Sequence, residues 1–218
     1  MSRVVVLDMA GTTVSDDGSV EHAFMAAFDD VVPGADAQEQ SRAMGIVHQT
    51  MGQSKIDVFR LVLGDEPRAR RALEVFERAY LAEIGAGRVR AVDGAEAVLQ
   101  QLRNQGHGVC LTTGFPPRIR DRLVDWLGWS TRVDLALSPV DAGRGRPYPD
   151  MVLTAFLRLG GEDVAELVVV GDTPSDMLSG RRAGAATRVG VLTGGSTPEQ
   201  LRAAGATLVS QSVVGLGP

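Results

Sequence analysis

The sequence of 218 residues has little cysteine, little lysine and no long apolar run. Its single cysteine, Cys110, permits no internal disulfide, so a cytoplasmic location is expected. No apolar run is long enough to cross a bilayer and no signal-peptide pattern opens the chain, so no membrane partner is expected. The net charge of −5 and the scattered arginines give no reason to expect nucleic acid as a partner.

The chain has almost no lysine, although lysine is normally a common residue. Of 22 Lys and Arg residues only one is lysine, Lys55 in the segment "MGQSKIDVFR". Chance in an arginine-rich composition is one explanation. The alternative is chemistry that a guanidinium cannot perform, because a lysine amine can lose its proton and act as a nucleophile.

Alternating strand and helix patterns predict an α/β fold, a Rossmann-like parallel sheet with covered faces. The expected buried strands are Val4–Leu7, Gly108–Thr112, Leu167–Val170 and Thr187–Leu192. The expected helices between them are Asp93–Gln105 with Asp93 as N-cap, Pro117–Leu127, Pro149–Leu159 and Pro174–Ala183.

The segment after the first strand interrupts this alternation. It contains the helical patterns Glu21–Val31, Ala37–Val47 and Arg68–Ile84, and no convincing strand. We therefore predict a core domain formed by residues 1–14 and 91–218, with residues 15–90 inserted as a helical cap domain.

Acidic residues follow two of the expected strands. Asp8 lies in "LDMAGTT", and Asp172 and Asp176 lie in "VVVGDTPSD". Ligands of doubly wound sheets bind at the carboxyl ends of the strands, and carboxylate oxygens there suit a hard cation such as Mg²⁺. Taken singly, such residues are also common turn formers and helix caps.

Two further motifs favour a functional site over turn and cap residues. "LTTGF" places Thr112 and Thr113 at a third strand end as anion donors, and "GRGRPYPD" supplies Arg146 as a cation for a phosphoryl group. In this chain order the set resembles the haloacid dehalogenase superfamily of phosphoryl-transfer enzymes. The resemblance implies that Asp8 is the nucleophile. It also implies Mg²⁺ as cofactor, bound by Asp8, the carbonyl of Ala10, Asp172 and Asp176, and a phosphoryl site formed by Ala10, Gly11, Thr12, Thr112, Thr113 and Gly114.

The first motif departs from that of the ordinary phosphatases of the superfamily, which carry a second aspartate where this chain has Ala10. A phosphate-ester hydrolase without its general acid should lose roughly 10²–10⁴ in rate. Cleavage of a phosphorus–carbon bond needs no such acid but does need an electron sink on carbon, which a lysine imine provides. Ala10, Arg146 and Lys55 together resemble the phosphonatase branch of the superfamily.

The residues around Lys55 agree with this assignment. Ser54 and Asp57 have the spacing of a helix start with Ser54 as N-cap, which places Lys55 in the first turn. There the helix dipole and partial burial would both lower the pKa of the amine.

Other positions differ from the phosphonatase pattern. Val58 replaces a histidine that relays protons in that branch, and Phe115 replaces a tyrosine. His48 could supply a relay, although a lone histidine is more often structural. The departures suggest a substituted phosphonoaldehyde as substrate.

The resemblance thus implies a hydrolase that cleaves phosphonoacetaldehyde or a related 2-oxoalkylphosphonate through an imine on Lys55. Met51 and Gly52 would let the cap approach the core closely, and a homodimer through the caps is expected. The alternatives are a phosphatase or phosphomutase, a haloacid dehalogenase, and a non-catalytic scaffold. Ala10 argues against the first and the acidic loop against the second.

Overall fold

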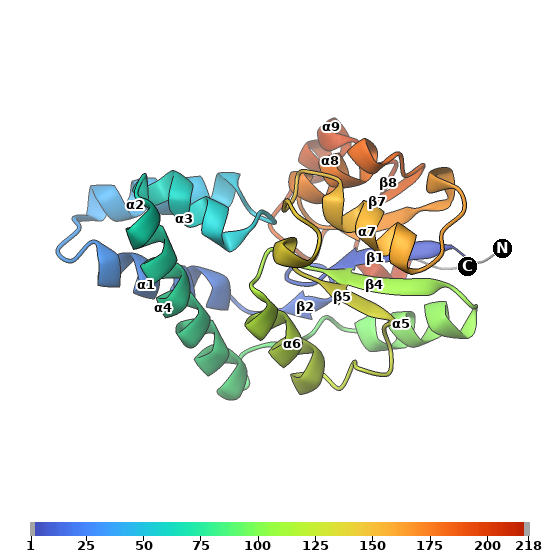
Figure 1. Cartoon of the computed structure of the whole chain (residues 1–218), viewed down its shortest axis with the longest axis horizontal. Coiled ribbons are helices and arrows are strands. Elements are labelled where there is room, and N and C mark those ends of the chain that lie inside the picture. The colour runs from blue at the N-terminus through green and yellow to red at the C-terminus, as the bar shows by residue number, and fades with distance from the viewer. Residues whose placement is uncertain (1–2, 216–218) are drawn as a thin grey trace.

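The computed structural model describes residues 3–215, which form an α/β unit beside a group of helices (Figure 1). A six-stranded sheet in the order β5-β4-β1-β6-β7-β8 organises the α/β unit, and every neighbouring pair is parallel. The strands are β1 (Val4–Asp8), β4 (Gly108–Thr112), β5 (Leu135–Leu137), β6 (Val168–Gly171), β7 (Thr187–Val191) and β8 (Leu208–Ser210). The predicted α/β class with a parallel sheet is confirmed.

The strand order fixes where a ligand can bind. The chain runs outward from β1 to β4 and β5, then returns to place β6, β7 and β8 on the other side of β1. Such a reversal opens a crevice at the carboxyl ends of the central strands. The predicted catalytic motifs follow β1, β4 and β6, so they converge on this crevice.

Helices cover both faces of the sheet (Figure 1). Side chains alternate along β1, so that Val5 and Leu7 pack with one apolar cluster and Val4 and Val6 with another. The second cluster includes Cys110, which is fully buried, and burial raises the pKa of its thiol. The covering helices are α5 (Ala95–Asn104) and α6 (Pro117–Trp126) on the first face, and α7 (Asp150–Arg158) and α8 (Pro174–Ala183) on the second.

Several elements differ from the sequence-based expectation. The predicted N-cap of α5 is wrong, because Gly94 holds that position in a left-handed conformation with φ of 79°. The strands β5 and β8 and the helix α9 (Pro198–Ala204) were not expected. β5 and β8 have only three residues each, which is too short for an alternating pattern to stand out.

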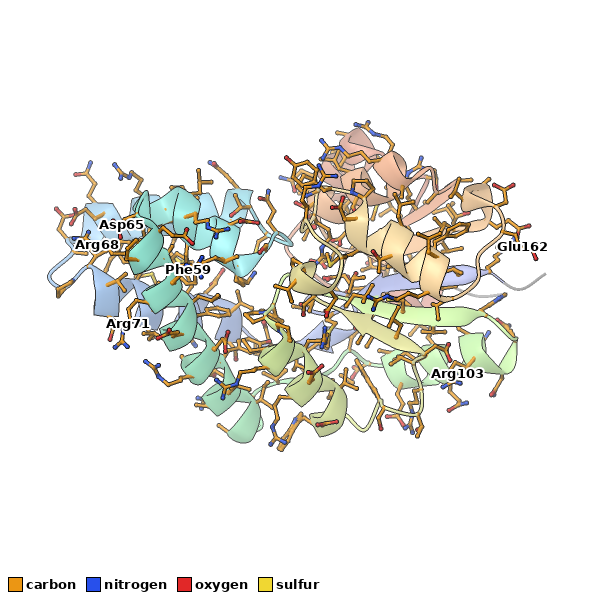
Figure 2. The ribbon with its side chains drawn as sticks, in the orientation of Figure 1. Phe59, Asp65, Arg68, Arg71, Arg103 and Glu162 are labelled. Atoms are coloured by element: carbon orange, nitrogen blue, oxygen red, sulfur yellow. The ribbon has the colours of Figure 1, made fainter. Side chains whose placement is uncertain are left out.

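The helices α1 to α4 form a separate group, which we call the helical unit. Its elements are α1 (Ser19–Val31), α2 (Ala37–Gln49), α3 (Lys55–Leu63) and α4 (Glu66–Gly85). Aromatic rings fill its centre, where Phe24 stacks on Phe59 at 4.9 Å and Phe59 meets Phe76 at 6.0 Å. Figure 2 shows Arg71 on the outer side of the helical unit, where it pairs with Asp30 at 3.0 Å.

Two short strands join the helical unit to the sheet. β2 (Val14–Ser15) pairs antiparallel with β3 (Arg90–Ala91), so the two connections run side by side. The expectation of no strand in this segment is therefore wrong at its edges, where two-residue strands give no sequence signal. The division into a core and an inserted cap stays a prediction.

Within residues 3–215, no helix combines the length and the apolar character needed to cross a membrane.

Candidate active site

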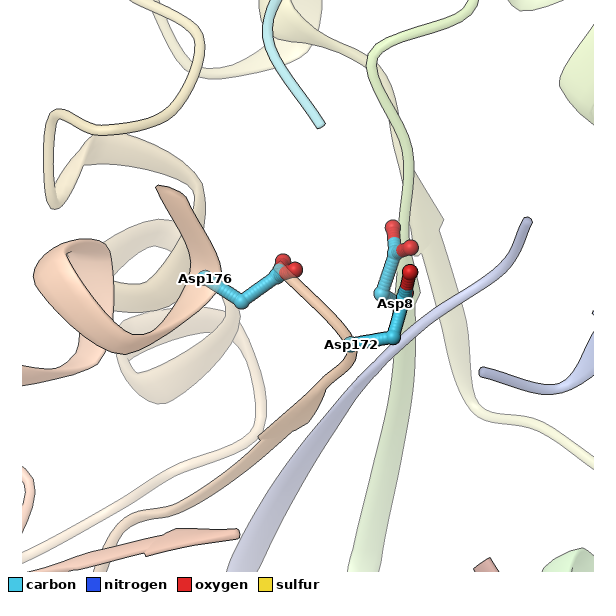
Figure 3. Close-up of side chains that lie close together, drawn as sticks. All are labelled: Asp8, Asp172 and Asp176. Carbon is cyan, nitrogen blue, oxygen red and sulfur yellow. The ribbon is translucent and has the colours of Figure 1, made fainter. Parts of the chain in front are cut away.

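Three buried carboxylates meet in the crevice at the carboxyl ends of β1 and β6. Asp8 ends β1, Asp172 follows β6 directly, and Asp176 lies in the first turn of α8. One oxygen of each lies within 4.8 Å of the others (Figure 3). We call these residues the carboxylate cluster. Oxygen ligands at this spacing could bind a metal ion.

Local structure holds two of the carboxylates in place. Thr173 is the N-cap of α8, and a capping box joins it to Asp176, with 2.5 Å between Thr173 Oγ1 and Asp176 Oδ2. The hydroxyl of Thr12 donates to Asp172 Oδ1 at 2.8 Å. The loop after β1 and the start of α8 therefore fix the cluster before any ligand binds.

Arg146 is the cation of this cluster. Its Nη1 donates to Asp8 Oδ1 at 2.5 Å and to Asp176 Oδ1, and the side chain is buried. Its Nε is also buried and has no hydrogen-bond partner among residues 3–215. A buried donor without a partner is unfavourable, so this nitrogen is a candidate to receive a ligand oxygen.

The cluster has more negative than positive groups. Burial raises the pKa of Asp8 to about 7, against the opposing effect of Arg146. Burial and the charges of Asp8 and Asp176 hold the pKa of Asp172 well above its usual range. One guanidinium faces three carboxylates, so a divalent cation fits both the charge and the oxygen donors of the site.

A cavity of about 750 Å³ lies against this cluster and extends to the helical unit. Asp8, Asp172 and Arg146 line it from the sheet side, and Lys55 lines it from α3. A cavity of this size accommodates a small phosphorylated or phosphonylated molecule with room to spare.

Lys55 is buried where the helical unit meets the α/β unit. It is the first residue of α3, and its backbone N–H donates to the carbonyl of Gly114 at 3.0 Å. Its Nζ lies 5.3 Å from the centre of the Phe115 ring, and no hydrogen bond or ion pair within residues 3–215 involves it. Burial, with a smaller contribution from the charge of Arg146, lowers the pKa of Lys55 to about 8, against the opposing effects of Asp8 and Asp16.

The start of α3 differs from the prediction in one respect. Ser54 occupies the N-cap position as expected, but its side chain makes no capping hydrogen bond, so that part of the prediction is wrong. Its backbone angles, φ −57° and ψ 127°, lie outside the usual capping geometry, because this segment contacts the α/β unit. Lys55 nevertheless lies in the first turn.

Two glycines allow the segment before α3 to lie against the α/β unit. A Cβ on Gly52, which has φ of 80°, would lie 2.6 Å from Thr173 Oγ1, and one on Gly114 would lie 2.1 Å from the carbonyl oxygen of Gln53. Neither position can hold a larger residue unless the backbone moves. Lys55 is thereby held close to the carboxylate cluster.

The remaining predicted site residues divide into two groups. Thr12 and Thr112 are buried, but neither they nor Asp176 are among the cavity-lining residues, since Thr12 bonds Asp172 and Thr112 is the last residue of β4. His48 lines the cavity, but its side chain is 58% exposed and pairs with Glu21 at 2.8 Å. The other predicted residues that line the cavity are Ala10, Gly11, Met51, Gly52, Thr113 and Gly114.

Sequence reasoning missed two features of the cavity wall. Asp16 lines the cavity from the link between β2 and α1, and no motif marks it in the sequence. Gly194 lies in a loop after β7, where an added Cβ would lie 1.8 Å from Asp172 Oδ2. The "TGGS" segment follows a strand, so the strand-end rule could have identified this loop.

Comparisons with known proteins agree with this geometry. Residues 2–184 match a family model described as haloacid dehalogenase-like hydrolase. A phosphonoacetaldehyde hydrolase from Bacillus cereus is 32% identical over 205 residues, which cover 89% of this chain and 77% of the relative.

Two solved structures share the whole fold. A hydrolase from Pseudomonas syringae has a TM-score of 0.85 at 25% identity, covering 99% of this chain and 96% of its own. A phosphonoacetaldehyde hydrolase-like protein from Oleispira antarctica has a TM-score of 0.81 at 25% identity, covering 99% and 90%.

Proposed function

Because the chain belongs to the haloacid dehalogenase-like hydrolase family, on its phosphonatase branch, we propose that it cleaves the carbon–phosphorus bond of phosphonoacetaldehyde or a related 2-oxoalkylphosphonate. The observation that carries the proposal is the placement of the only lysine. Lys55 is buried in the wall of the cavity that Asp8 also lines, and burial lowers the pKa of its amine to about 8. An amine of this kind is suited to attack a carbonyl carbon.

The first chemical step uses Lys55. Its ammonium first releases a proton, the neutral amine adds to the aldehyde carbon, and that proton returns as water leaves and a protonated imine forms. The imine lies one carbon from the phosphorus, so it can accept the electron pair of the breaking carbon–phosphorus bond. Lys55 thus takes the part that a general acid plays in ester hydrolysis, which agrees with the presence of Ala10 in place of a second carboxylate.

The second step uses Asp8. Its carboxylate attacks phosphorus, an aspartyl phosphate forms, and the carbon leaves as an enamine on Lys55. Water then hydrolyses the aspartyl phosphate, and protonation and hydrolysis of the enamine release an aldehyde. Arg146 must move partly from Asp8 toward the phosphoryl oxygens, and its unpaired Nε is suited to bind one of them.

Asp8, Asp172 and Asp176 would hold Mg²⁺, with the carbonyl of Ala10 as a further proposed ligand. The ion would neutralise charge on the phosphoryl oxygens and orient the group for attack.

Incubation with phosphonoacetaldehyde, borohydride reduction and peptide mapping test the proposal, with phosphate release measured in parallel. We expect a reduced adduct on the peptide that contains Lys55, no adduct in Lys55→Arg, and phosphate release that depends on Mg²⁺. An adduct without phosphate would point to a related aldehyde as substrate. No adduct and no phosphate with this aldehyde or its substituted analogues would refute the proposal.

A phosphatase is the main alternative, and Ala10 separates the two. If the protein is a phosphatase with a weakened acid, Ala10→Asp should raise its activity on simple phosphate esters. We expect this variant to gain no carbon–phosphorus cleavage. The homodimer through the helical unit also remains a proposal, and light scattering of the purified protein tests it.

A further inference from the structure

Asp16 is an acidic residue of the cavity wall that the mechanism above does not use. It follows β2 in the link to α1, is partly buried and lines the cavity together with Lys55. The buried hydroxyl of Tyr80 in α4 donates to Asp16 Oδ2 at 3.2 Å. The link and the helix that hold this pair are 64 residues apart in the chain.

One aromatic ring relates this pair to Lys55. The centre of the Phe115 ring lies 4.7 Å from the centre of the Tyr80 ring and 5.3 Å from Lys55 Nζ. Lys55 and Asp16 also influence each other electrostatically, since each shifts the pKa of the other toward its charged form. We call Lys55, Phe115, Tyr80 and Asp16 the lysine region.

We propose that Asp16, held by Tyr80, is the proton-transfer residue for imine formation and hydrolysis at Lys55. This inference rests on the proposed function, because it assigns a residue to its first and last steps. Imine formation needs such a residue, since two protons must move from nitrogen to the departing oxygen.

The other candidates near Lys55 are poorly suited to this role. Val58, one turn along α3, is apolar. His48 is largely exposed and bound to Glu21. Asp8 is bound to Arg146 and is needed for attack on phosphorus.

The surroundings of Asp16 suit reversible proton transfer. Burial raises the pKa of Asp16 above 3.8, so it takes up a proton more readily than an exposed aspartate. The Tyr80 hydroxyl moderates this shift and holds the carboxylate in place through its hydrogen bond to Oδ2. The pKa of Tyr80 lies well above its usual value, chiefly because of burial, so its hydroxyl remains a hydrogen-bond donor.

The step balances without an added reagent. The Lys55 ammonium gives one proton to the Asp16 carboxylate through water in the cavity that both residues line, because the two groups form no direct ion pair. The free amine then forms a bond to the aldehyde carbon while the carbonyl π pair moves to oxygen. That oxygen takes the proton from Asp16, which then accepts a second proton from nitrogen. Asp16 passes this proton to the hydroxyl group, which leaves as water as the carbon–nitrogen double bond forms. Two ammonium protons leave in water, and the third stays on the iminium nitrogen.

The test compares rates of borohydride-trapped adduct formation with phosphonoacetaldehyde in wild type, Asp16→Asn and Asp57→Asn. Asparagine keeps the size of Asp16 and can accept from Tyr80, but it cannot take up the proton. We expect Asp16→Asn to form the Lys55 adduct roughly 10²–10³-fold more slowly than wild type. Asp57→Asn is the matched control, because Asp57 is exposed on α3 and pairs with Arg60, and its rate should be unchanged.

Rescue separates proton transfer from a structural role. In Asp16→Ala, added formate can enter the space of the lost carboxylate, and we expect it to restore adduct formation at least tenfold. Adduct formation by Asp16→Asn at the wild-type rate would overturn the inference, as would a slow Asp16→Ala that formate does not rescue. Thermal melting shows whether each variant is folded. The wild-type adduct tests the proposed function separately, so either idea can fail without the other.

Discussion

The carboxylate cluster and the lysine region stabilise their charges in different ways. In the carboxylate cluster Arg146 bridges Asp8 and Asp176, and the hydroxyl of Thr12 bonds Asp172. In the lysine region the ammonium of Lys55 lies over an aromatic ring with no hydrogen-bond partner among the described residues. The first region is a network of direct ion pairs and hydrogen bonds, whereas the second holds a buried ammonium against an aromatic ring without a direct counter-ion.

This difference matches the different needs of the two steps in the proposed mechanism. A phosphoryl group carries negative charge, so its site needs cations and fixed donors. An imine forms from a neutral amine, so its site needs a lysine that gives up its proton easily. Burial without a close counter-ion lowers the pKa of Lys55, whereas Arg146 moderates the rise in the pKa of Asp8.

The sharpest way to separate the two regions is to disable each in turn. Asp8→Asn should reduce phosphate release by roughly 10⁴–10⁶-fold, as expected for loss of a nucleophile. It should still form the Lys55 adduct, because the imine does not need Asp8. Lys55→Met should lose both adduct and phosphate. Peptide mapping after borohydride and a phosphate assay on the same samples measure both. A loss of adduct in Asp8→Asn would show that the two regions do not act independently.

Removal of metal should affect the carboxylate cluster alone. Chelation should lower phosphate release by roughly 10²-fold or more, because Asp8, Asp172 and Asp176 would lose the ion that neutralises the phosphoryl oxygens. Added Mg²⁺ should restore the activity, and trapping of Lys55 should be unaffected throughout. Full phosphate release in the presence of chelator would contradict the assignment of the cluster as a metal site.

The sequence predicted the carboxylate cluster better than the lysine region. Asp8, Asp172 and Asp176 follow strands that turned out to be neighbours in the sheet, and the ends of parallel strands converge in space. The pairing of Arg146 with both Asp8 and Asp176 could not be foreseen, because it depends on the path of the loop before α7.

The arrangement of the lysine region depends on tertiary contacts more than that of the carboxylate cluster does. The position of Lys55 in the first turn of α3 followed from local spacing. The Ser54 side chain makes no capping hydrogen bond because this segment contacts the α/β unit. Asp16 has its partner Tyr80 64 residues away, and no periodicity links them. Phe115 was expected only as a variant of a motif, yet it packs between Tyr80 and Lys55.

The pH dependence of imine formation measures how far the lysine region lowers the pKa of the Lys55 amine. Below the pKa of Lys55, about 8, the neutral fraction of the amine rises tenfold per pH unit, and above it the fraction is level. We expect the adduct rate to follow, rising roughly 10–30-fold from pH 6.5 to 8. The groups that act on this amine are Arg146, Asp8 and Asp16. Timed borohydride quenching between pH 6 and 10 gives the profile, and a rate that keeps rising to pH 10 would contradict the shift.

The smallest expected effect is a gain in stability when the buried charge is removed. An amine whose pKa falls from 10.5 to about 8 on folding costs roughly 3 kcal/mol while it is charged. Lys55→Met keeps an unbranched side chain of similar length, shorter by one atom, without the charge. At pH 7 we therefore expect the free energy of unfolding to rise by roughly 1–2 kcal/mol.

The sign of this difference depends on pH. Below pH 8 the Lys55 amine is charged in the folded wild type, so the full free-energy cost of burying that charge lowers its stability. Between about 8 and 10.5 the unfolded chain binds more protons than the folded protein, so wild-type stability rises with pH. The advantage of Lys55→Met should therefore shrink across this range. Urea unfolding of both proteins at pH 7 and pH 10 measures it. If the two proteins differ in free energy of unfolding by the same amount at both pH values, the methionine stabilises by packing. The buried charge of Lys55 would then not destabilise the wild type.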